Sequence, residues 1–495
     1  MDPFVPTNVP PKVTMDSDCD AFLQGPARSS SEALDPLAAF ASPDGLDPQL
    51  QAFLEDACAQ LCRWFGSANQ RSPLPSLRLL PDAFPEVGGL GAERLLDDLQ
   101  QVMDGAYQPT HPGALAHLDP PPNTASIAAE LICAGLNNNL LAEELSPSLS
   151  QLERQLCGWF ASCFDFPEGS GGVPASGGTL SNLTALVTAR HALNLNAVSN
   201  AVVLTSDDAH VSLFKACRVM GLHSDALRRI PVDVTGCLRL DALEDELNRL
   251  ATENRPCLAI VATAGTTVRG AIDPLREIAT IARDHGTWMH VDGAIGAVFA
   301  LSGRTRALMD GLGEADSITV NPQKLLGIAK TSSLLLVRDA STLHAAFGTG
   351  LPYMEPASAG PHGGEMGVQG SRPAEILKLW LGLRQLGITG INSLLNAAVE
   401  RRERFQQCLD EQALDLLSGP LHLLTCVPKD ADSDRSERWS ARLRQRLLDE
   451  QIMVSRPHYR GRHHIKVVFG NPHTSDALIH HLGMRINESI GSGVH

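Results

Sequence analysis

The chain has 495 residues, of which 43% are hydrophobic and 19% charged, and 56 acidic against 40 basic side chains give a net charge of −16. This length exceeds what one hydrophobic core supports, so two or three structural units are expected. The acidic balance argues against partners such as nucleic acids or anionic lipids, and no apolar run is long enough to span a bilayer. Met1 is not followed by a basic and apolar leader, so we expect a cytoplasmic protein that acts on a small molecule.

The N-terminal part is predicted to be an arm followed by helices. Residues 1–48 are rich in Pro, Ser and Asp without a sustained period, which is typical of a loose arm. Residues 49–65 carry apolar side chains at helical spacing and predict a helix: Leu50, Phe53, Leu54, Ala57, Leu61 and Phe65. We assign residues 49–125 to an N-terminal helical segment.

From about residue 175, short β-rich runs alternate with longer helical stretches. The runs are AVVLT near 201, CLAIVAT near 257, TWMHVD near 287, SITV at 317 and SLLLV at 333. This alternation predicts an α/β fold with a mostly parallel sheet and crossover helices over residues 126–390. Residues 354–371 form a glycine-rich loop that is too long for an ordinary connection, and residues 391–495 are predicted to form a smaller α+β domain.

A possible anion site opens the first helix of this region. Ser176-Gly177-Gly178-Thr179 precedes a helix predicted from Leu180 to about Leu195. Backbone N–H groups at the start of a helix, with a hydroxyl beside them, suit a phosphate. A tight turn with Thr179 as a helix N-cap explains the same residues equally well.

Three chemically useful side chains follow predicted strands. Asp292 ends the run 287–292, where α/β sheets place ligands, and its carboxylate suits either a pyridinium N–H or the following turn. Lys324 follows SITV, and a lysine in an apolar site loses its proton readily and becomes a nucleophile, although most lysines are only solvated charges. His210 can stack on a flat ring or serve the structure alone.

Together with ATAGTTVRGAIDP, these features resemble the group II pyridoxal-phosphate-dependent amino acid decarboxylases, the family of the glutamate, aromatic-amino-acid and 2,4-diaminobutyrate decarboxylases. The resemblance runs from about Thr110 to Leu386. Its landmarks are HPGALAHLDPP, SPSLSQLE, SGGTLSNLTALVTAR, AHVSLFKA, HVDGAIG, NPQK and GSRPAEILKLW. It implies fold type I, the aspartate aminotransferase-like fold of pyridoxal-phosphate enzymes, a homodimer with shared active sites, and pyridoxal 5′-phosphate as the cofactor.

The resemblance also implies roles for individual residues. Lys324 corresponds to the Schiff-base lysine, Asp292 to the partner of the pyridine nitrogen, and Tyr353 to the tyrosine that protonates the substrate carbon after CO₂ leaves. Arg372 matches an arginine that holds the substrate carboxylate, and His117 is a second candidate for contact with the substrate. The other expected cofactor contacts are His210, stacked on the ring, Ala294, packed on it, and Gly178, Thr179, Thr267, Asn321 and Gln323 around the phosphate.

The chain departs from the family in ways that bear on the substrate. Gln323 replaces the usual histidine before the lysine and cannot carry charge. Leu325 replaces a common tryptophan, HVDGAI replaces the usual HVDAAW, and Gly113-Ala114-Leu115 replaces a stretch where many relatives have two adjacent aromatic residues. We therefore expect a small aliphatic, acidic or diamino acid rather than an aromatic one.

Two alternatives to simple decarboxylation are kept. Decarboxylation can be coupled to oxidative deamination, which gives an aldehyde, although relatives that do so replace the tyrosine retained here as Tyr353. The chain can also be a non-catalytic relative that binds the cofactor. Residues 456–467, RPHYRGRHHIKV, lack neighbouring carboxylates or cysteines and predict a solvated face, so no metal is expected.

Overall fold

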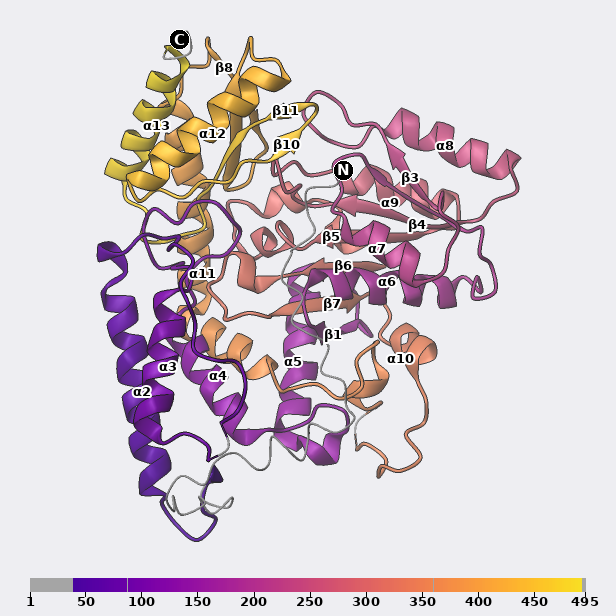
Figure 1. Cartoon of the computed structure of the whole chain (residues 1–495). Helices are drawn as coiled ribbons and strands as arrows, with labels where there is room; N and C mark the ends of the chain where they lie inside the picture. Colours follow the sequence, from indigo (N-terminus) through magenta and orange to yellow (C-terminus); the bar gives the residue numbers. More distant parts are fainter. Residues whose placement is uncertain (1–38, 87, 359, 492–495) are drawn as a thin grey trace, which may run out of the picture. The chain divides into compact units, whose positions relative to one another are not determined.

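The computed structural model describes residues 39–86, 88–358 and 360–491, so most of the predicted arm, residues 1–38, lies outside it. The chain divides into two compact units (Figure 1). One comprises Met1–Gly66 with Ser76–Ala106, and the other Ser67–Pro75 with Tyr107–His495. Every predicted site residue belongs to the second unit.

The described residues of the first unit form two helices, α2 (Pro48–Gly66) and α3 (Ala92–Asp104). The first of them confirms the helix predicted over residues 49–65. Side-chain hydrogen bonds connect the pair: Gln60 Nε2 donates to the Leu96 carbonyl at 3.1 Å, and Trp64 Nε1 donates to the Met103 carbonyl at 2.9 Å. Neither helix contains a buried residue.

A seven-stranded sheet forms the centre of the second unit, in the order β1-β7-β6-β5-β4-β2-β3. The strands are β1 (Gly171–Ala175), β2 (Val202–Ser206), β3 (Leu227–Ile230), β4 (Cys257–Thr263), β5 (Trp288–Gly293), β6 (Ser317–Val320) and β7 (Ser333–Val337). Strands β2 to β6 pair in parallel, which confirms the mostly parallel α/β sheet, whereas β7 runs antiparallel to both of its neighbours. The sequence did not reveal that reversal, because a strand buried on both faces is a continuous apolar run in either direction.

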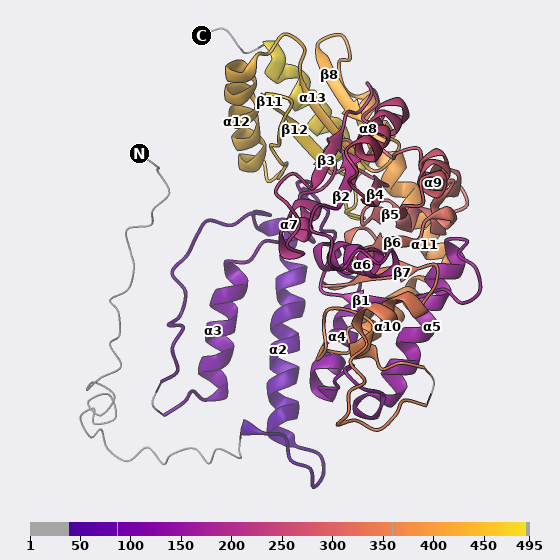
Figure 2. The same cartoon turned by 90° about the vertical axis from the view of Figure 1, so that its right-hand side faces the viewer.

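Helices cover both faces of this sheet. On one face, α5 (Pro147–Cys163), α8 (Leu240–Thr252), α9 (Leu275–Asp284) and α11 (Ile376–Gln407) share a core with the strands. On the other face lie α6 (Gly178–Ala192), α7 (Ser212–Val219) and α10 (Ser341–Phe347). Figure 2 shows α6 and α7 on one side of the strands and α8 and α9 on the other. The helix predicted from about Leu180 to Leu195 is α6, which starts and ends slightly earlier.

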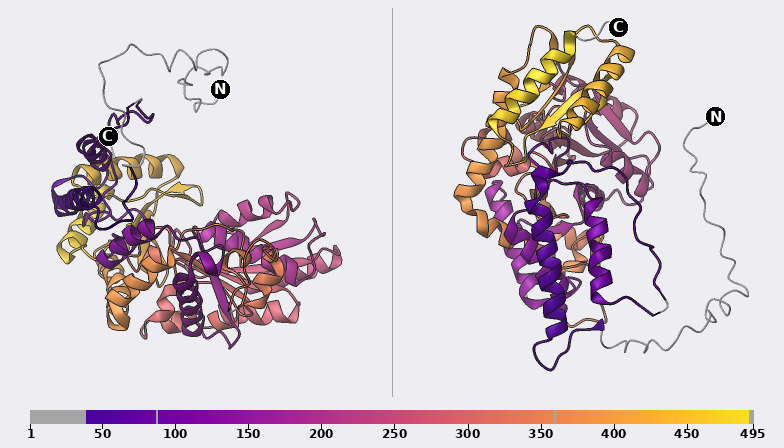
Figure 3. Two further views of the ribbon diagram at one scale, coloured as in Figure 1. Left: turned by 90° about the horizontal axis from the view of Figure 1, so that it is seen from below. Right: turned by 60° about the vertical axis from the view of Figure 1, so that its left-hand side comes forward.

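The C-terminal part has its own small sheet, in the order β12-β9-β8. Its strands are β8 (Leu414–Ser418), β9 (Leu423–Pro428) and β12 (Ile465–Val468), and a separate hairpin joins β10 (His458–Tyr459) to β11 (Arg462–His463). Helices α12 (Ser433–Asp449) and α13 (Asp476–Gly491) and the end of α11 pack against this sheet around one hydrophobic core, drawn in orange and yellow in Figure 3. Helix α11 is interrupted at Gly387, whose φ of 61° and ψ of 174° are not helical, and the predicted domain boundary after residue 390 lies shortly beyond this interruption.

Helix α4 (Thr124–Leu136) packs against α11. Short 3₁₀ helices occupy the connections: η2 (Ala68–Gln70), η3 (Glu143–Leu145), η4 (Ala297–Leu301), η5 (Arg306–Met309), η6 (Leu312–Glu314), η7 (Pro322–Lys324) and η8 (Gly363–Glu365). None of the helices within the described ranges is long and apolar enough to cross a membrane.

Candidate active site

A cavity of about 240 Å³ lies where β2, β4, β5 and β6 end and α6 begins. The carboxyl ends of parallel strands meet at one edge of a sheet, so residues far apart in the chain converge there. Every residue that was predicted to contact a cofactor lines this cavity: Gly178, Thr179, His210, Thr267, Asp292, Ala294, Asn321, Gln323 and Lys324. The structure therefore brings together side chains that the sequence presents in five separate segments.

Lys324 is the nucleophile candidate of the cavity. It ends the short helix η7 directly after β6, and the Nζ atom makes no hydrogen bond to any described residue. Burial lowers the pKa of Lys324, while the negative charges of Asp292 and Asp119 act in the opposite direction. Burial thus disfavours the ammonium form, and the neutral amine is the form that attacks a carbonyl carbon.

Asp292 is held in place at the end of β5. Its Oδ2 accepts a hydrogen bond from Asn182 Nδ2 at 2.8 Å, and its Oδ1 accepts one from the Ala294 N–H at 3.2 Å. The next residue, Gly293, explains a departure from the family pattern, because a Cβ there would lie 2.6 Å from the Cβ of Ala297. The alanine usual at this position in HVDAAW does not fit the present packing.

His210 follows β2 and faces the same cavity. Its Nδ1 accepts the Ser212 N–H at 3.2 Å, so the proton of a neutral ring is on Nε2. Although the ring is exposed to the open cavity, the surrounding protein lowers the pKa of His210 by desolvation. The imidazole is therefore neutral and can lie flat against a ring without adding a charge.

The start of α6 forms the anion-binding end of the cavity. Gly177 is the N-cap with a φ of 96°, a conformation that favours glycine, and makes no side-chain cap, so the alternative of Thr179 as N-cap is wrong. A Cβ on Gly178 would lie 3.1 Å from Asn321 Nδ2, so glycine keeps this approach open. Like any helix, α6 begins with N–H groups that have no carbonyl partner within the helix, which suits an anion.

Gln323 lines the cavity but already has one hydrogen bond. Its Oε1 accepts the backbone N–H of Ser332, which fixes the side chain against the start of β7. A neutral amide in this place orients its neighbours but cannot transfer a proton as the usual histidine can.

Three predicted site residues lie elsewhere. Arg372 is buried and forms a two-pronged ion pair with Glu153, in which Nη1 donates to Oε2 at 2.6 Å, and it does not line the cavity. Its guanidinium is committed to that carboxylate, so this position does not fit a role in holding the substrate. Tyr353 is 69% exposed and away from the cavity wall, and His117 is exposed as well.

Lys466 is a candidate that the sequence reasoning missed. It stands in β12, and its Nζ donates to the carbonyl of Thr267 in the cavity wall at 3.3 Å. Burial lowers the pKa of Lys466, and so does the positive charge of Lys324. The run IKVVF, with one lysine among apolar residues, could have indicated this position. The solvated face predicted for residues 456–467 is wrong for His464, Ile465 and Val467, which are buried, and for Lys466, which is half-buried.

The neighbourhood of Lys466 contains further charges. Asp119 forms an ion pair with Lys330 at 2.7 Å, and the pKa values of both Lys324 and Lys466 respond to the Asp119 carboxylate. Although part of the His117 ring is exposed, desolvation by the surrounding protein and the positive charge of Lys466 lower the pKa of His117. Within the described ranges, no group of three or more His, Cys, Asp or Glu side chains is arranged to hold a metal ion.

His111 and the stretch after it serve packing. His111 is buried, and its Nδ1 accepts the Gly113 N–H at 2.9 Å. Leu115, in the stretch where the family resemblance leads us to expect aromatic residues, is fully buried in the core of the small sheet. It does not line the cavity, so its side chain serves the packing of that core.

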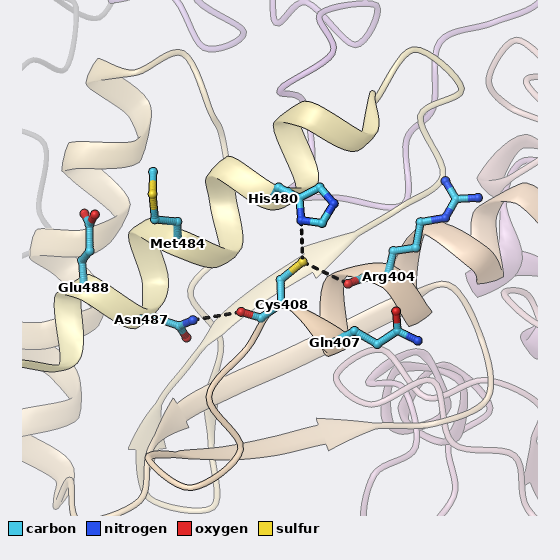
Figure 4. Close-up of a pocket in the computed structure, with 7 residues that line it drawn as sticks. All are labelled: Arg404, Gln407, Cys408, His480, Met484, Asn487 and Glu488. Atoms are coloured by element: carbon cyan, nitrogen blue, oxygen red, sulfur yellow. Dashed lines mark hydrogen bonds between the residues drawn. The ribbon is translucent and has the colours of Figure 1, made fainter.

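A second and larger hollow of about 520 Å³ lies between α11 and α13 (Figure 4). Cys408 Sγ donates to the Arg404 carbonyl at 3.2 Å and lies 3.2 Å from Nδ1 of His480. Burial raises the pKa of the Cys408 thiol, so the thiolate is disfavoured. The pair lacks an activated nucleophile.

Comparison with known proteins agrees with this geometry. The model of the pyridoxal-dependent decarboxylase conserved domain matches residues 73–418. The chain is 32% identical to L-2,4-diaminobutyrate decarboxylase of Rhizobium meliloti over 83% of each chain, and 28% identical to cysteine sulfinic acid decarboxylase of Rattus norvegicus over 84% of this chain and 88% of that one. The crystal structure of mouse CSAD superposes with a TM-score of 0.83 and 25% identity, covering 90% of this chain and 99% of that chain. The chain therefore belongs to the pyridoxal-dependent decarboxylase family and is a pyridoxal-phosphate-dependent carboxy-lyase.

Proposed function

We propose that this carboxy-lyase removes CO₂ from a small, non-aromatic L-amino acid and releases the corresponding amine. The observation that carries the proposal is the largely buried Lys324, whose pKa is lowered by burial, in one cavity with Asp292 and His210. This combination supplies an amine nucleophile, an anion and a flat neutral ring at one place, as pyridoxal-phosphate chemistry requires.

The cavity residues fit pyridoxal 5′-phosphate. Thr263 Oγ1 is buried in the cavity wall without a hydrogen-bond partner among the described residues, and an oxygen on the cofactor ring would satisfy it. We propose that Lys324 binds the carbonyl carbon, Asp292 the ring nitrogen and His210 one face of the ring. The phosphate side would contact residues at the start of α6 and beside it: Gly178, Thr179, Thr267 and Asn321. When bound, the cofactor supplies an electron sink for the bond between Cα and the carboxylate.

Lys466, rather than Arg372, is proposed to receive a carboxylate of the substrate. Its ammonium makes one hydrogen bond, to the Thr267 carbonyl, and so keeps donors for a ligand, whereas Arg372 is paired with Glu153. A carboxylate beside Lys466 would also offset the repulsion between this side chain and Lys324, which lowers the pKa of Lys466.

The Asp119–Lys330 pair is proposed to recognise the substrate side chain. An acidic substrate would compete with Asp119 for Lys330, whereas a diamino acid would compete with Lys330 for Asp119. The variants Asp119→Asn and Lys330→Met separate these substrate classes. A KM that rises only in Asp119→Asn indicates a diamino acid, and a KM that rises only in Lys330→Met indicates an acidic one.

Tyr353 is proposed as the proton donor that completes the reaction. Its 69% exposure means that the hydroxyl reaches a cavity only by movement of its segment or in a second copy of the chain. We propose the second, a homodimer with shared sites, and a cytoplasmic location stays a prediction. Mixing Lys324→Ala with Tyr353→Phe subunits tests this assembly, because activity returns in mixed dimers only if Tyr353 serves the partner's site.

The test of the proposed reaction is CO₂ release by the cofactor-loaded protein from a panel of L-amino acids, with the organic product identified. The panel contains aspartate, glutamate, cysteine sulfinate, 2,4-diaminobutyrate, ornithine, lysine, tyrosine and tryptophan. One amine per CO₂ from an acidic or diamino substrate supports the proposal. An aldehyde with ammonia contradicts the role of Tyr353, preference for tyrosine or tryptophan contradicts the substrate class, and cofactor binding without turnover supports a non-catalytic relative.

A further inference from the structure

Asp292 belongs to a chain of buried polar side chains that extends away from the cavity wall. Asn182 Nδ2 donates to Asp292 Oδ2 at 2.8 Å, and Asn182 Oδ1 lies 3.1 Å from His290 Nε2. On the other side of the imidazole, His290 Nδ1 lies 2.8 Å from Ser317 Oγ, which also accepts the indole N–H of Trp288 at 2.8 Å. All five residues are buried, and His290 and Ser317 are completely inaccessible to solvent.

The strands and α6 dictate this arrangement. Trp288, His290 and Asp292 alternate along β5 and so share one face of the sheet, and the register of β5 and β6 sets His290 opposite Ser317. Asn182 lies one turn beyond Gly178, so the helix that begins at the anion end of the cavity also contacts Asp292. Helix α6 therefore contributes both to the anion-binding end of the cavity, through Gly178, and to the hydrogen bonding of Asp292, through Asn182.

The hydrogen bonds of the chain have only one consistent direction when Asp292 is ionised. A carboxylate only accepts hydrogen bonds, so the Asn182 amide must turn Nδ2 toward Asp292 and Oδ1 toward His290. His290 must then carry its proton on Nε2, and the Ser317 hydroxyl must donate to Nδ1. The reversed amide would set two acceptors against each other at Asp292.

The state of His290 agrees with this direction. Burial lowers the pKa of His290 to about 4, so the ring is neutral near pH 7 and has one proton to place. Asn182 Nδ2 also donates to Ser212 Oγ at 2.9 Å, which further fixes the amide plane. A buried anion is costly unless its hydrogen bonds are preorganised, and here each donor is held by the next residue.

We propose that Asn182, His290 and Ser317 are positioning residues that keep the carboxylate of Asp292 aimed at the ring nitrogen of the cofactor. The inference rests on the proposed function in one respect, that Asp292 faces this nitrogen. The new element is that the contribution of the ring nitrogen to cofactor affinity depends on a proton at Nε2 of His290, a residue that does not line the cavity.

Two substitutions of His290 separate this role from simple packing. In His290→Gln the side-chain amide N–H reaches the place of Nε2, whereas in His290→Asn it reaches only the place of Nδ1. We would measure binding of pyridoxal 5′-phosphate, and of its 1-deaza analogue with carbon in place of the ring nitrogen, to each apoprotein by equilibrium dialysis. We expect His290→Gln to bind both ligands within about threefold of wild type. In His290→Asn, the affinity for pyridoxal 5′-phosphate should fall about tenfold, with no change for the analogue.

Ser317→Ala is a milder variant, and the control Asp292→Ala separates the role of Asp292 from the roles of His290 and Ser317. Ser317→Ala removes the donor to Nδ1 and should weaken pyridoxal 5′-phosphate selectively by about threefold, which preserves the test if His290→Asn does not fold. Equal losses for both ligands in the His290 variants would overturn the inference in favour of packing. If Asp292→Ala loses the preference for the ring nitrogen while His290→Asn and Ser317→Ala retain it, the relay is wrong and the Asp292 assignment stands. If Asp292→Ala has no selective effect, the proposed role of Asp292 itself fails.

Discussion

Two hollows of the second unit differ in whether their polar groups already have hydrogen-bond partners. The hollow between α11 and α13 is the larger, about 520 Å³ against about 240 Å³, yet the Cys408 thiol there already bonds to the Arg404 carbonyl and to His480. In the smaller cavity, the Nζ of Lys324 and the Oγ1 of Thr263 make no hydrogen bond to the described residues. Unused polar groups in a desolvated cavity therefore identify the reactive site better than volume does.

The largest expected effect follows from removing the nucleophile of the smaller cavity. Lys324→Ala should lower kcat by at least about 10³-fold, because no other described amine in the cavity wall can replace it. Loss of the absorbance of lysine-bound cofactor checks the same variant without turnover. Persistence of that absorbance would show that another group holds the cofactor. The conclusion that unpaired polar groups identify the reactive site would then be wrong.

The second-largest effect is expected from substitution of Lys466. Lys466→Ala should raise KM by about 10- to 100-fold, since one charge-assisted hydrogen bond contributes about 1.5–3 kcal/mol. Lys466→Arg retains the charge and is the matched control, with a smaller rise. Steady-state kinetics with the substrate found in the panel provides the measurement, and an unchanged KM in Lys466→Ala would remove the side chain from the substrate site.

His422 is a buried polar residue with unpaired ring nitrogens that lines neither of the two hollows, so it shows what such a group does outside a reactive site. Neither ring nitrogen has a partner among the described residues, and the ring packs 5.6 Å from that of Phe299. Burial lowers the pKa of His422 to about 3. A base whose folded pKa lies below its unfolded value of about 6.5 stabilises the fold above that value, and the contribution is lost as pH falls toward the folded pKa.

His422→Leu should therefore weaken the pH dependence of stability. Between pH 7.5 and 5 the wild type is expected to lose about 2 kcal/mol through this group, and the variant should lack that loss. Urea unfolding at the two pH values measures the difference. His285→Leu, at an exposed histidine, is the control and should leave the slope unchanged. A slope that persists in His422→Leu would mean that other groups govern acid unfolding.

What the sequence could predict is local. Lys324, Asp292 and His210 each follow a strand directly, so a strand pattern and a short motif suffice to locate them at the edge of the sheet. The resemblance supplied the cofactor and the fold class for the same reason, because its landmarks surround these strand ends.

What the sequence could not predict depends on partners distant in the chain. Arg372 was assigned to the substrate because a motif does not show that Glu153 neutralises it in the interior. Lys466 was missed because it reaches the cavity only through packing of the small sheet against the loop after β4, through the Thr267 carbonyl. The network behind Asp292 escaped notice because its members stand on α6, β5 and β6 and meet only in the folded state.

The smallest effect is expected at Cys408, and this variant tests whether the larger hollow contributes to catalysis. Cys408→Ser retains a donor to the Arg404 carbonyl and an acceptor near His480, so activity should stay within about twofold and the free energy of unfolding within about 0.5 kcal/mol. Cys426→Ser is the matched control, because Cys426 is fully buried in the core of the small sheet and a hydroxyl there should cost about 1–3 kcal/mol. If Cys408→Ser lowered kcat while Cys426→Ser did not, the larger hollow would be coupled to catalysis. Because a group whose hydrogen bonds are already made has little left for a ligand, we expect the opposite.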